Sequence, residues 1–134
     1  MARLILDTGV LIAAVRGRLQ VDELFDADDF AIPAVVVAEY LAGVELDGDP
    51  GRAAAQRAFL EEVLAVVPVH VYDQATATHH AELLAYVRRS GTKRGAHDLI
   101  VAACARAADR MVLSTDNSAR FGDLPGVSVR LIPS

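Results

Sequence analysis

Two aspartates follow apolar runs that are typical of buried β-strands. Asp7 comes directly after residues 4–6, and Asp116 lies just past residues 111–113. In open α/β sheets, ligands bind beyond the carboxyl ends of the strands. We therefore expect both carboxylates to lie at the edge of a sheet where a ligand would bind.

Two further acidic residues stand in apolar helical patterns, where a charge is locally unfavourable. Glu39 occurs near the start of a helix that follows a second predicted strand, and Asp98 opens an alanine-rich helix. Successive acids are separated by 32, 59 and 18 residues (39 − 7, 98 − 39 and 116 − 98). Only a folded core brings such distant residues together, and the predicted topology places all four at one edge.

Clustered carboxylates repel one another, so they must bind protons or a cation. Oxygen ligands without histidine or cysteine favour Mg²⁺ or Mn²⁺ over zinc. A metal held by carboxylates can bind a phosphate oxygen, generate hydroxide and stabilise the leaving oxygen, which is the chemistry of phosphodiester hydrolysis. The cation would also allow an acidic protein to act on a polyanionic substrate.

Each acid also has a purely structural interpretation. Asp7 and Asp98 suit helix N-caps or first-turn acids, which the helix dipole favours. Glu39 would suit a solvated helix rim, and Asp116 would suit an ordinary turn. We favour the functional interpretation, because four acids in such positions occur together by chance far less often than any one of them does alone.

Composition limits the class of protein. The 134 residues include 13 basic and 18 acidic side chains, a net charge of −5, which excludes a protein that coats nucleic acid through bulk charge. At about 150 residues per domain, residues 1–134 form a single domain. The only cysteine, Cys104, excludes a disulfide framework and a cysteine-rich zinc site. Without a signal peptide pattern or an apolar run of about 20 residues, we expect a cytoplasmic protein with no membrane span.

Short strands alternate with longer helices along the chain, which favours a parallel sheet with helices on both faces, a doubly wound α/β sandwich. Thr8 is predicted to cap the first helix. We expect strands at residues 4–6, 30–32, 67–71, 111–113 and 127–131, and helices at 10–15, 21–25, 34–46, 52–66, 73–89 and 97–108.

Three stretches, residues 6–12, 38–43 and 98–103, together resemble PIN-domain ribonucleases, and specifically the VapC-type toxins of type II toxin–antitoxin systems. The resemblance covers nearly the whole chain. It implies an α/β/α sandwich around a parallel five-stranded sheet, a Mg²⁺ or Mn²⁺ site and cleavage of RNA. It further implies a homodimer that a cognate VapB-type antitoxin inhibits. By this match Asp7, Glu39 and Asp98 are acids of the metal site, and Thr8 orients the first carboxylate or a water.

The fourth site position has two candidates. The family usually shows a threonine, any residue, then Asp or Asn, with a phenylalanine a few residues later. Aligning Ser114 with that threonine selects Asp116, whereas aligning Thr115 and keeping the distance to Phe121 selects Asn117. We prefer Asp116 because a carboxylate binds a cation more strongly. A second departure from the family pattern is the glycine at position 9, where serine or asparagine is more common.

The expected mechanism assigns a role to each of these residues. Mg²⁺ would be bound by Asp7, Asp98 and either Asp116 or Asn117, and it would polarise the scissile phosphate. Glu39 would bind a second metal or position the attacking water. In-line attack would then leave a 5′-phosphate and a 3′-hydroxyl.

One basic cluster precedes Asp98 and consists of Arg88, Arg89, Lys93 and Arg94. These side chains would contact RNA phosphates at the mouth of the site, or they would compensate the negative end of the preceding helix. The two interpretations have equal support from the sequence.

Apolar stripes on the helices at 34–46 and 52–66 exceed what one face of a sheet requires. They suggest a homodimer interface or a groove for the antitoxin.

Two other functions compete with a nuclease. A catalytically silent PIN-like module would bind RNA or protein without cleaving it. A phosphoacceptor domain is disfavoured, because receivers need a lysine near the fifth strand and the only lysine is Lys93. Phosphatases of the haloacid-dehalogenase type need a second aspartate where this chain has Gly9.

Overall fold

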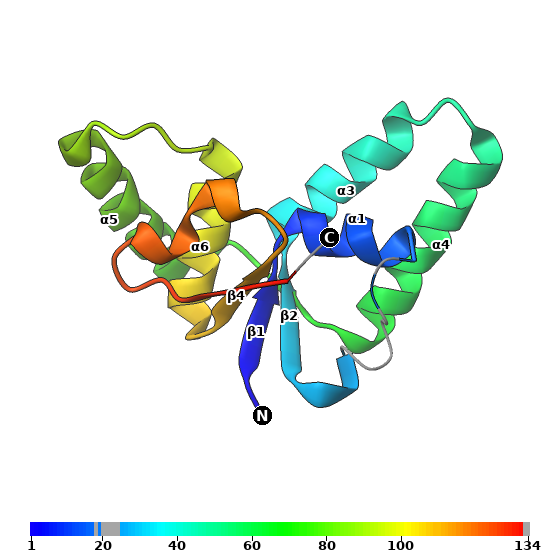
Figure 1. Ribbon diagram of the computed structural model, residues 1–134, viewed down its shortest axis with the longest axis horizontal. Coiled ribbons are helices and arrows are strands. Elements are labelled where there is room, and N and C mark those ends of the chain that lie inside the picture. The colour runs from blue at the N-terminus through cyan, green and yellow to red at the C-terminus, as the bar shows by residue number, and fades with distance from the viewer. Residues whose placement is uncertain (18, 20–24, 133–134) are drawn as a thin grey trace.

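A parallel sheet forms the centre of the molecule (Figure 1). The computed structural model describes residues 1–17, 19 and 25–132. These residues form five parallel strands in the order β3-β2-β1-β4-β5, so the predicted sheet is confirmed. The strands are β1 (Arg3–Leu6), β2 (Asp29–Pro33), β3 (Val69–His70), β4 (Met111–Ser114) and β5 (Val129–Leu131).

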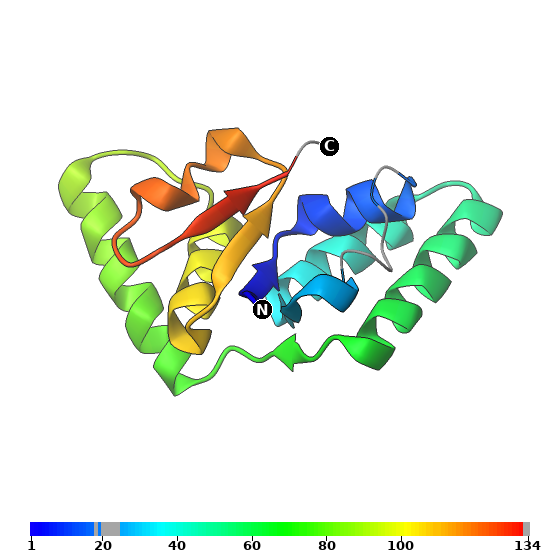
Figure 2. The ribbon, with the colours of Figure 1, turned by 60° about the horizontal axis from the view of Figure 1, so that its bottom comes forward.

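Helices pack around this sheet in two groups (Figures 1 and 2). One group lies toward the β2 end and the other toward the end that carries β4 and β5. The first group is α1 (Thr8–Val15), α3 (Ala34–Leu46) and α4 (Pro50–Val66), and the second is α5 (Gln74–Ser90) and α6 (Ala96–Ala108). Two short 3₁₀ turns, η1 (Asn117–Ala119) and η2 (Phe121–Asp123), connect β4 to β5. Among the described helices, none has both the length and the apolar character needed to cross a membrane.

The helix boundaries follow local chemistry. Asp49 caps α4 ahead of Pro50, and Asp73 caps α5 by accepting a hydrogen bond from the Thr76 amide. Gly91 ends α5 in the left-handed conformation, which a glycine adopts without strain. The prediction that Thr8 caps the first helix is wrong, because the preceding carboxylate of Asp7 accepts the hydrogen bond instead. A short helix expected at residues 21–25 falls almost entirely outside the described residues.

The central strands are buried on both faces, as the apolar runs predicted. Leu4, Ile5 and Leu6 of β1 are completely buried, and Val112 and Leu113 of β4 are equally inaccessible. Because β1 pairs with both β2 and β4, Asp7, which follows β1, lies at the middle of the carboxyl-terminal edge of the sheet.

At the opposite edge, the guanidinium of Arg110, whose side chain is 10% exposed, joins two strands. It donates to the carbonyls of Leu4 and Asp29 and to the Asp29 carboxylate, at 3.0–3.2 Å. We expect Arg110→Ala to lower the free energy of unfolding by about 2 kcal/mol, measured by urea denaturation, because charged hydrogen bonds are lost. Arg57→Ala is the control, since it removes only an exposed ion pair with Glu45 and should change stability by about 0.5 kcal/mol. Equal effects of the two changes would contradict this role.

Candidate active site

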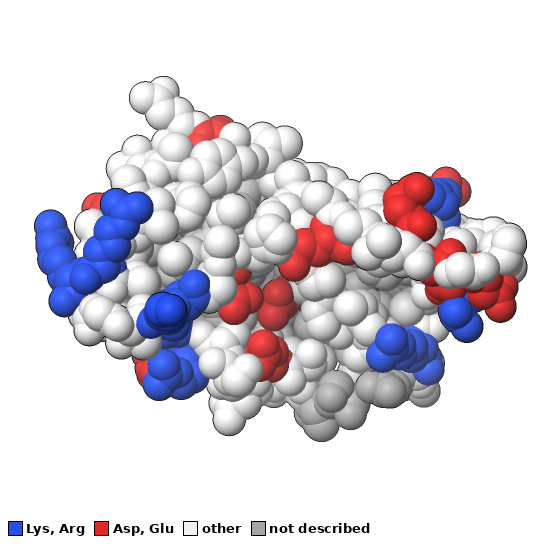
Figure 3. Space-filling model, turned by 90° about the horizontal axis from the view of Figure 1, so that it is seen from above, with Lys and Arg blue, Asp and Glu red and all other residues white. Residues whose placement is uncertain are grey.

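The four predicted acids meet at the carboxyl-terminal edge of the sheet. Figure 3 looks down on this edge and shows acidic side chains grouped around a central depression. Asp7 follows β1 and Asp116 follows the neighbouring β4, whereas Glu39 and Asp98 reach the same edge from α3 and α6. Burial raises the pKa values of Asp7 and Asp98, and repulsion from other members of the group raises both further. The fold therefore brings together acids that are far apart in the sequence.

Asp7 is buried at the centre of this edge, with 8% of its surface exposed. Its carboxylate accepts hydrogen bonds from the Thr8 amide at 2.9 Å and from the Ser114 hydroxyl at 3.0 Å. Burial raises the pKa of Asp7 despite these two bonds, and repulsion from Glu39 and Asp116 raises it further. This carboxylate is thus both the N-cap of α1 and a buried charge that a cation would stabilise.

Glu39 is held in place through both of its carboxylate oxygens. The Thr8 hydroxyl donates to Oε1 at 3.1 Å, and Nδ1 of His97 lies 2.9 Å from Oε2. Thr8 therefore orients two acids, Asp7 through its amide and Glu39 through its hydroxyl. The pairing of His97 with Glu39 was not predicted, although its place beside Asp98 in the sequence put it near the site.

Asp98 lies in the first turn of α6, and the N-cap of that helix is Gly95. The interpretation of Asp98 as an N-cap is therefore wrong, whereas that of a first-turn acid is correct. Burial raises the pKa of Asp98, and repulsion from Asp7, Asp116 and Glu39 adds to the effect, while His97 lowers it.

The two candidates for the fourth position differ in their charge and contacts. Asp116 is the N-cap of η1, where its carboxylate accepts a hydrogen bond from the Ser118 amide at 2.8 Å. Its negative charge contributes to the raised pKa values of both Asp7 and Asp98. Asn117 is exposed and begins η1. Asp116 is therefore the candidate that is electrostatically coupled to the other acids.

Gly9 allows α1 to approach the segment after β4. A Cβ atom at this position would lie 2.4 Å from Oγ1 of Thr115, much closer than real side chains approach. The side chain of Thr115 thus occupies the space beside Gly9. A serine or asparagine at position 9, as is usual in the family, would collide with this threonine unless one of the two moved.

Ser114 connects two of the acids, although its sequence position did not predict it to be a site residue. Its completely buried hydroxyl donates to Oδ2 of Asp7 at 3.0 Å and accepts from the Asp116 amide at 3.0 Å. A polar residue at the end of a buried apolar strand was the signal that could have identified it. The hydroxyl fixes Asp7 relative to the turn that carries Asp116.

We expect Ser114→Ala to reduce the activity of this site by about 10- to 100-fold, the usual cost of removing a group that orients a metal-binding residue. The change removes a donor from Asp7 and an acceptor from the Asp116 amide. Initial rates of RNA hydrolysis measure the effect. Ser128→Ala, an exposed serine just before β5 at the opposite edge of the sheet, is the control, and equal rates for both variants would refute the orienting role.

A hydrated divalent cation fits this donor set. Within residues 1–17, 19 and 25–132, no three acidic, histidine or cysteine side chains lie close enough together to enclose an ion directly. Mg²⁺ typically uses one or two carboxylates and keeps several water ligands, so it does not require such an enclosure. Burial and the negative charge of the neighbouring acids raise the pKa values of Asp7 and Asp98. A cation would neutralise this negative charge.

Residues 4–125 match the family model of the PIN domain. The chain belongs to the PIN-domain family. A ribonuclease VapC from Rickettsia bellii is 26% identical over 130 residues, which cover 97% of this chain and 96% of that protein. A tRNA(fMet)-specific endonuclease VapC from Shigella flexneri is 28% identical over 130 residues, with 95% of this chain and 96% of the relative covered.

A solved structure has the same fold as this PIN domain. It is that of VapBC-5 from Mycobacterium tuberculosis, a member of the VapBC family of toxin–antitoxin systems. The two chains superimpose with a TM-score of 0.75 at 28% identity, and the alignment covers 100% of each. The predicted fold, an α/β/α sandwich around a parallel five-stranded sheet, is thus confirmed.

The predicted basic cluster of this PIN domain divides into two kinds of residue. Arg88, Arg89 and Lys93 are exposed around the end of α5, and Figure 3 shows basic side chains on both sides of the acidic depression. Arg94 instead donates through Nη1 to the carbonyls of Ala119 and Arg120. Three of the four side chains are therefore exposed, whereas Arg94 binds backbone carbonyls of the protein itself.

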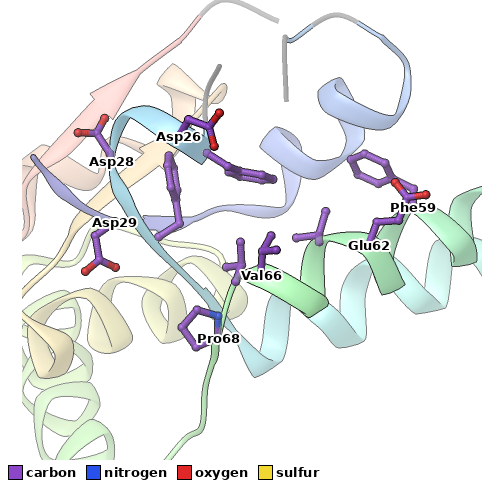
Figure 4. A pocket seen from close by; sticks show the side chains of 11 residues that line it. Asp26, Asp28, Asp29, Phe59, Glu62, Val66 and Pro68 are labelled. Atoms are coloured by element: carbon purple, nitrogen blue, oxygen red, sulfur yellow. The ribbon is translucent and has the colours of Figure 1, made fainter. Parts of the chain in front are cut away.

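Among the hollows that the described residues form, two lie beside α4 of the PIN domain. A groove of about 740 Å³ runs from Glu39 between α1, α3 and α4, with Ile12, Tyr40 and Val44 among its apolar lining. A second cavity, of about 440 Å³, lies at the opposite edge between β2 and α4 (Figure 4). Asp26 and Glu62 stand among its lining side chains, but it contains none of the four acids. The groove, and not this cavity, is continuous with the candidate active site.

Proposed function

We propose that this protein is a metal-dependent endoribonuclease that acts as the toxin of a toxin–antitoxin pair. The observation that carries the proposal is the group of four carboxylates at one edge of a PIN-domain sheet, with the pKa values of Asp7 and Asp98 raised by burial and mutual repulsion. The names of the two curated relatives support an activity on RNA.

Asp7, Asp98 and Asp116 are the residues that would hold Mg²⁺ or Mn²⁺, directly or through its water ligands. Asp116 takes the fourth position in place of Asn117, because its charge acts on both other aspartates. A divalent cation held there supplies positive charge to the scissile phosphate and lowers the pKa of water. An acidic protein can then bind RNA at this point, with Arg88, Arg89 and Lys93 contacting neighbouring phosphates.

Glu39 positions the attacking water and accepts its proton. The hydrogen bond from Thr8 and the contact with His97 hold its carboxylate in one orientation, so it needs little rearrangement when the substrate binds. Water then attacks the phosphorus in line with the leaving 3′ oxygen, which takes a proton from solvent and departs as a 3′-hydroxyl, while Glu39 returns its proton to solvent. The other fragment keeps a 5′-phosphate.

The proposed partners are a VapB-type antitoxin and a second copy of this chain. The VapBC-5 neighbour supports an antitoxin, because it belongs to a toxin–antitoxin family. The groove beside Glu39 offers an apolar surface that leads to the catalytic acids, so a bound segment would block the RNA site.

Induced expression without an antitoxin tests this function in cells. We expect growth arrest together with new RNA 5′ ends at a small set of sites, mapped by sequencing RNA that carries a 5′-phosphate. Asp7→Asn should remove both effects at equal protein levels. Identical 5′ ends with the wild type and the Asp7→Asn variant would refute the proposal, and tight RNA binding without new ends would support the catalytically silent module.

A further inference from the structure

Asp98 and Asp116 belong to segments that no pairing of strands connects. Asp98 sits on α6, which begins directly after the loop at residues 91–95, whereas Asp116 sits in the turn between β4 and η1. Repulsion between the two carboxylates would drive these segments apart. α6 packs against β4, and a direct contact at this end of the two elements would fix the separation of the carboxylates.

Arg94 provides this contact from the loop that precedes α6. Its Nη1 atom donates to the Ala119 carbonyl at 2.7 Å and to the Arg120 carbonyl at 2.8 Å. Ala119 is the last residue of η1, and Asp116 is the N-cap of the same turn. A single guanidinium nitrogen therefore joins the segment before Asp98 to the short turn that Asp116 begins.

The place where Arg94 binds is a corner that needs support. Arg120 has a φ of 47°, in the left-handed region that costs a non-glycine residue about 1 kcal/mol or more. The neighbouring side chains of Ala119 and Phe121 are buried, so the corner is anchored to the core on either side of the strained residue. Hydrogen bonds from a charged donor to two carbonyls of this corner stabilise its geometry.

Arg94 also differs from the rest of the basic cluster. Arg88, Arg89 and Lys93 are exposed, while Arg94 is half-buried with one nitrogen committed to two backbone carbonyls. An arginine that served mainly to contact RNA would present these donors to phosphate. The contacts of Arg94 are those of a structural tie.

We propose that Arg94 is a positioning residue that fixes Asp98 relative to Asp116 and so determines how strongly the site binds a divalent cation. The inference rests on the proposed function, in which these two carboxylates share a metal. Loss of the tie lets the two segments separate, which weakens cation binding before any RNA is present.

The test is the affinity of the purified full-length protein for Mn²⁺ without RNA, measured by electron paramagnetic resonance of free Mn²⁺. We expect Arg94→Ala to raise the Kd for Mn²⁺ about tenfold, the usual cost of losing an orienting contact. Arg57→Ala, an exposed arginine near the α3–α4 turn, should leave the Kd unchanged. An unchanged Kd for Mn²⁺ in Arg94→Ala would overturn the proposal. If Arg94→Ala lowers RNA affinity in EDTA and leaves Mn²⁺ binding unchanged, Arg94 contacts RNA and the proposal is likewise wrong.

A second variant and a second readout protect the test against misfolding. Arg94→Lys keeps one positively charged donor, so it should give a Kd between those of the wild type and Arg94→Ala. Hydrogen exchange in EDTA should be faster at residues 117–124 in Arg94→Ala and unchanged in Arg57→Ala. Unaltered exchange in Arg94→Ala would overturn the tie itself. A wild-type protein that binds Mn²⁺ without cleaving RNA would refute the proposed function and leave the role of Arg94 intact.

Discussion

Replacing Asp98 with asparagine should abolish RNA cleavage and at the same time raise the melting temperature of the metal-free protein. Burial and repulsion from Asp7, Asp116 and Glu39 all disfavour the charged form of Asp98. Asparagine has nearly the same shape but no charge, so it removes this repulsion from the folded state. The same change removes a cation ligand, and we expect the cleavage rate to fall by about 1,000-fold or more.

Two measurements on the Asp98→Asn variant check this result, namely cleavage of RNA in Mg²⁺ and thermal unfolding in EDTA. Asp123→Asn is a matched control, because Asp123 is exposed and its ion pair with Arg120 is long, at 3.8 Å. This control should keep its activity and melt within a few degrees of the wild type. A variant at position 98 that melts at a lower temperature than the wild type in EDTA would show that the carboxylate stabilises the fold.

Divalent cations should stabilise the protein strongly at neutral pH and hardly at all in acid. The pKa values of Asp7 and Asp98 are raised, so both groups bind protons more tightly in the folded chain than in the unfolded one. The stability of the metal-free protein therefore falls as pH rises from the ordinary pKa of aspartate through the raised values. Above that window both groups are charged when folded, and a cation relieves their repulsion.

Melting temperatures measured with Mn²⁺ and with EDTA from pH 4 to pH 8 test this dependence. At a Mn²⁺ concentration 100 times the Kd, the expected stabilisation near pH 7 is about 2.7 kcal/mol. Asp28, Asp47 and Asp73 have lowered pKa values, that of Asp47 about 2, so they favour folding as pH rises and act in the opposite direction. Their contributions cancel in the difference between the two conditions. A difference that does not change with pH would contradict a cation site built on Asp7 and Asp98.

The order and type of the elements could be predicted because the central strands of this fold are buried on both faces, so their sequences are short apolar runs. Asp7 and Asp116 follow two of these strands, so both could be placed at the carboxyl-terminal edge of the sheet from their sequence positions alone. The helix at residues 34–46 has the predicted boundaries, since Pro33 precedes it and the turn-forming residues that start at Asp47 follow it.

Interactions that depend on side-chain conformation could not be predicted. The bridge from Ser114 to Asp7 and the contact of His97 with Glu39 join residues that are 107 and 58 positions apart (114 − 7 and 97 − 39). Arg94 is adjacent to Lys93 in the sequence, yet only the folded chain shows that it bonds to carbonyls while its neighbour is exposed. Local sequence patterns show which residues are polar, but they do not predict which group each polar side chain bonds to.

Cleavage of RNA by the purified protein is the most direct test of a carboxylate-held metal site. The wild-type protein with Mg²⁺ or Mn²⁺ should cut RNA and leave 5′-phosphate ends. The same protein in EDTA, and Asp7→Asn with metal, should both leave the RNA intact. Equal cleavage under all three conditions would contradict the account, because the activity would then depend on neither the cation nor the central carboxylate.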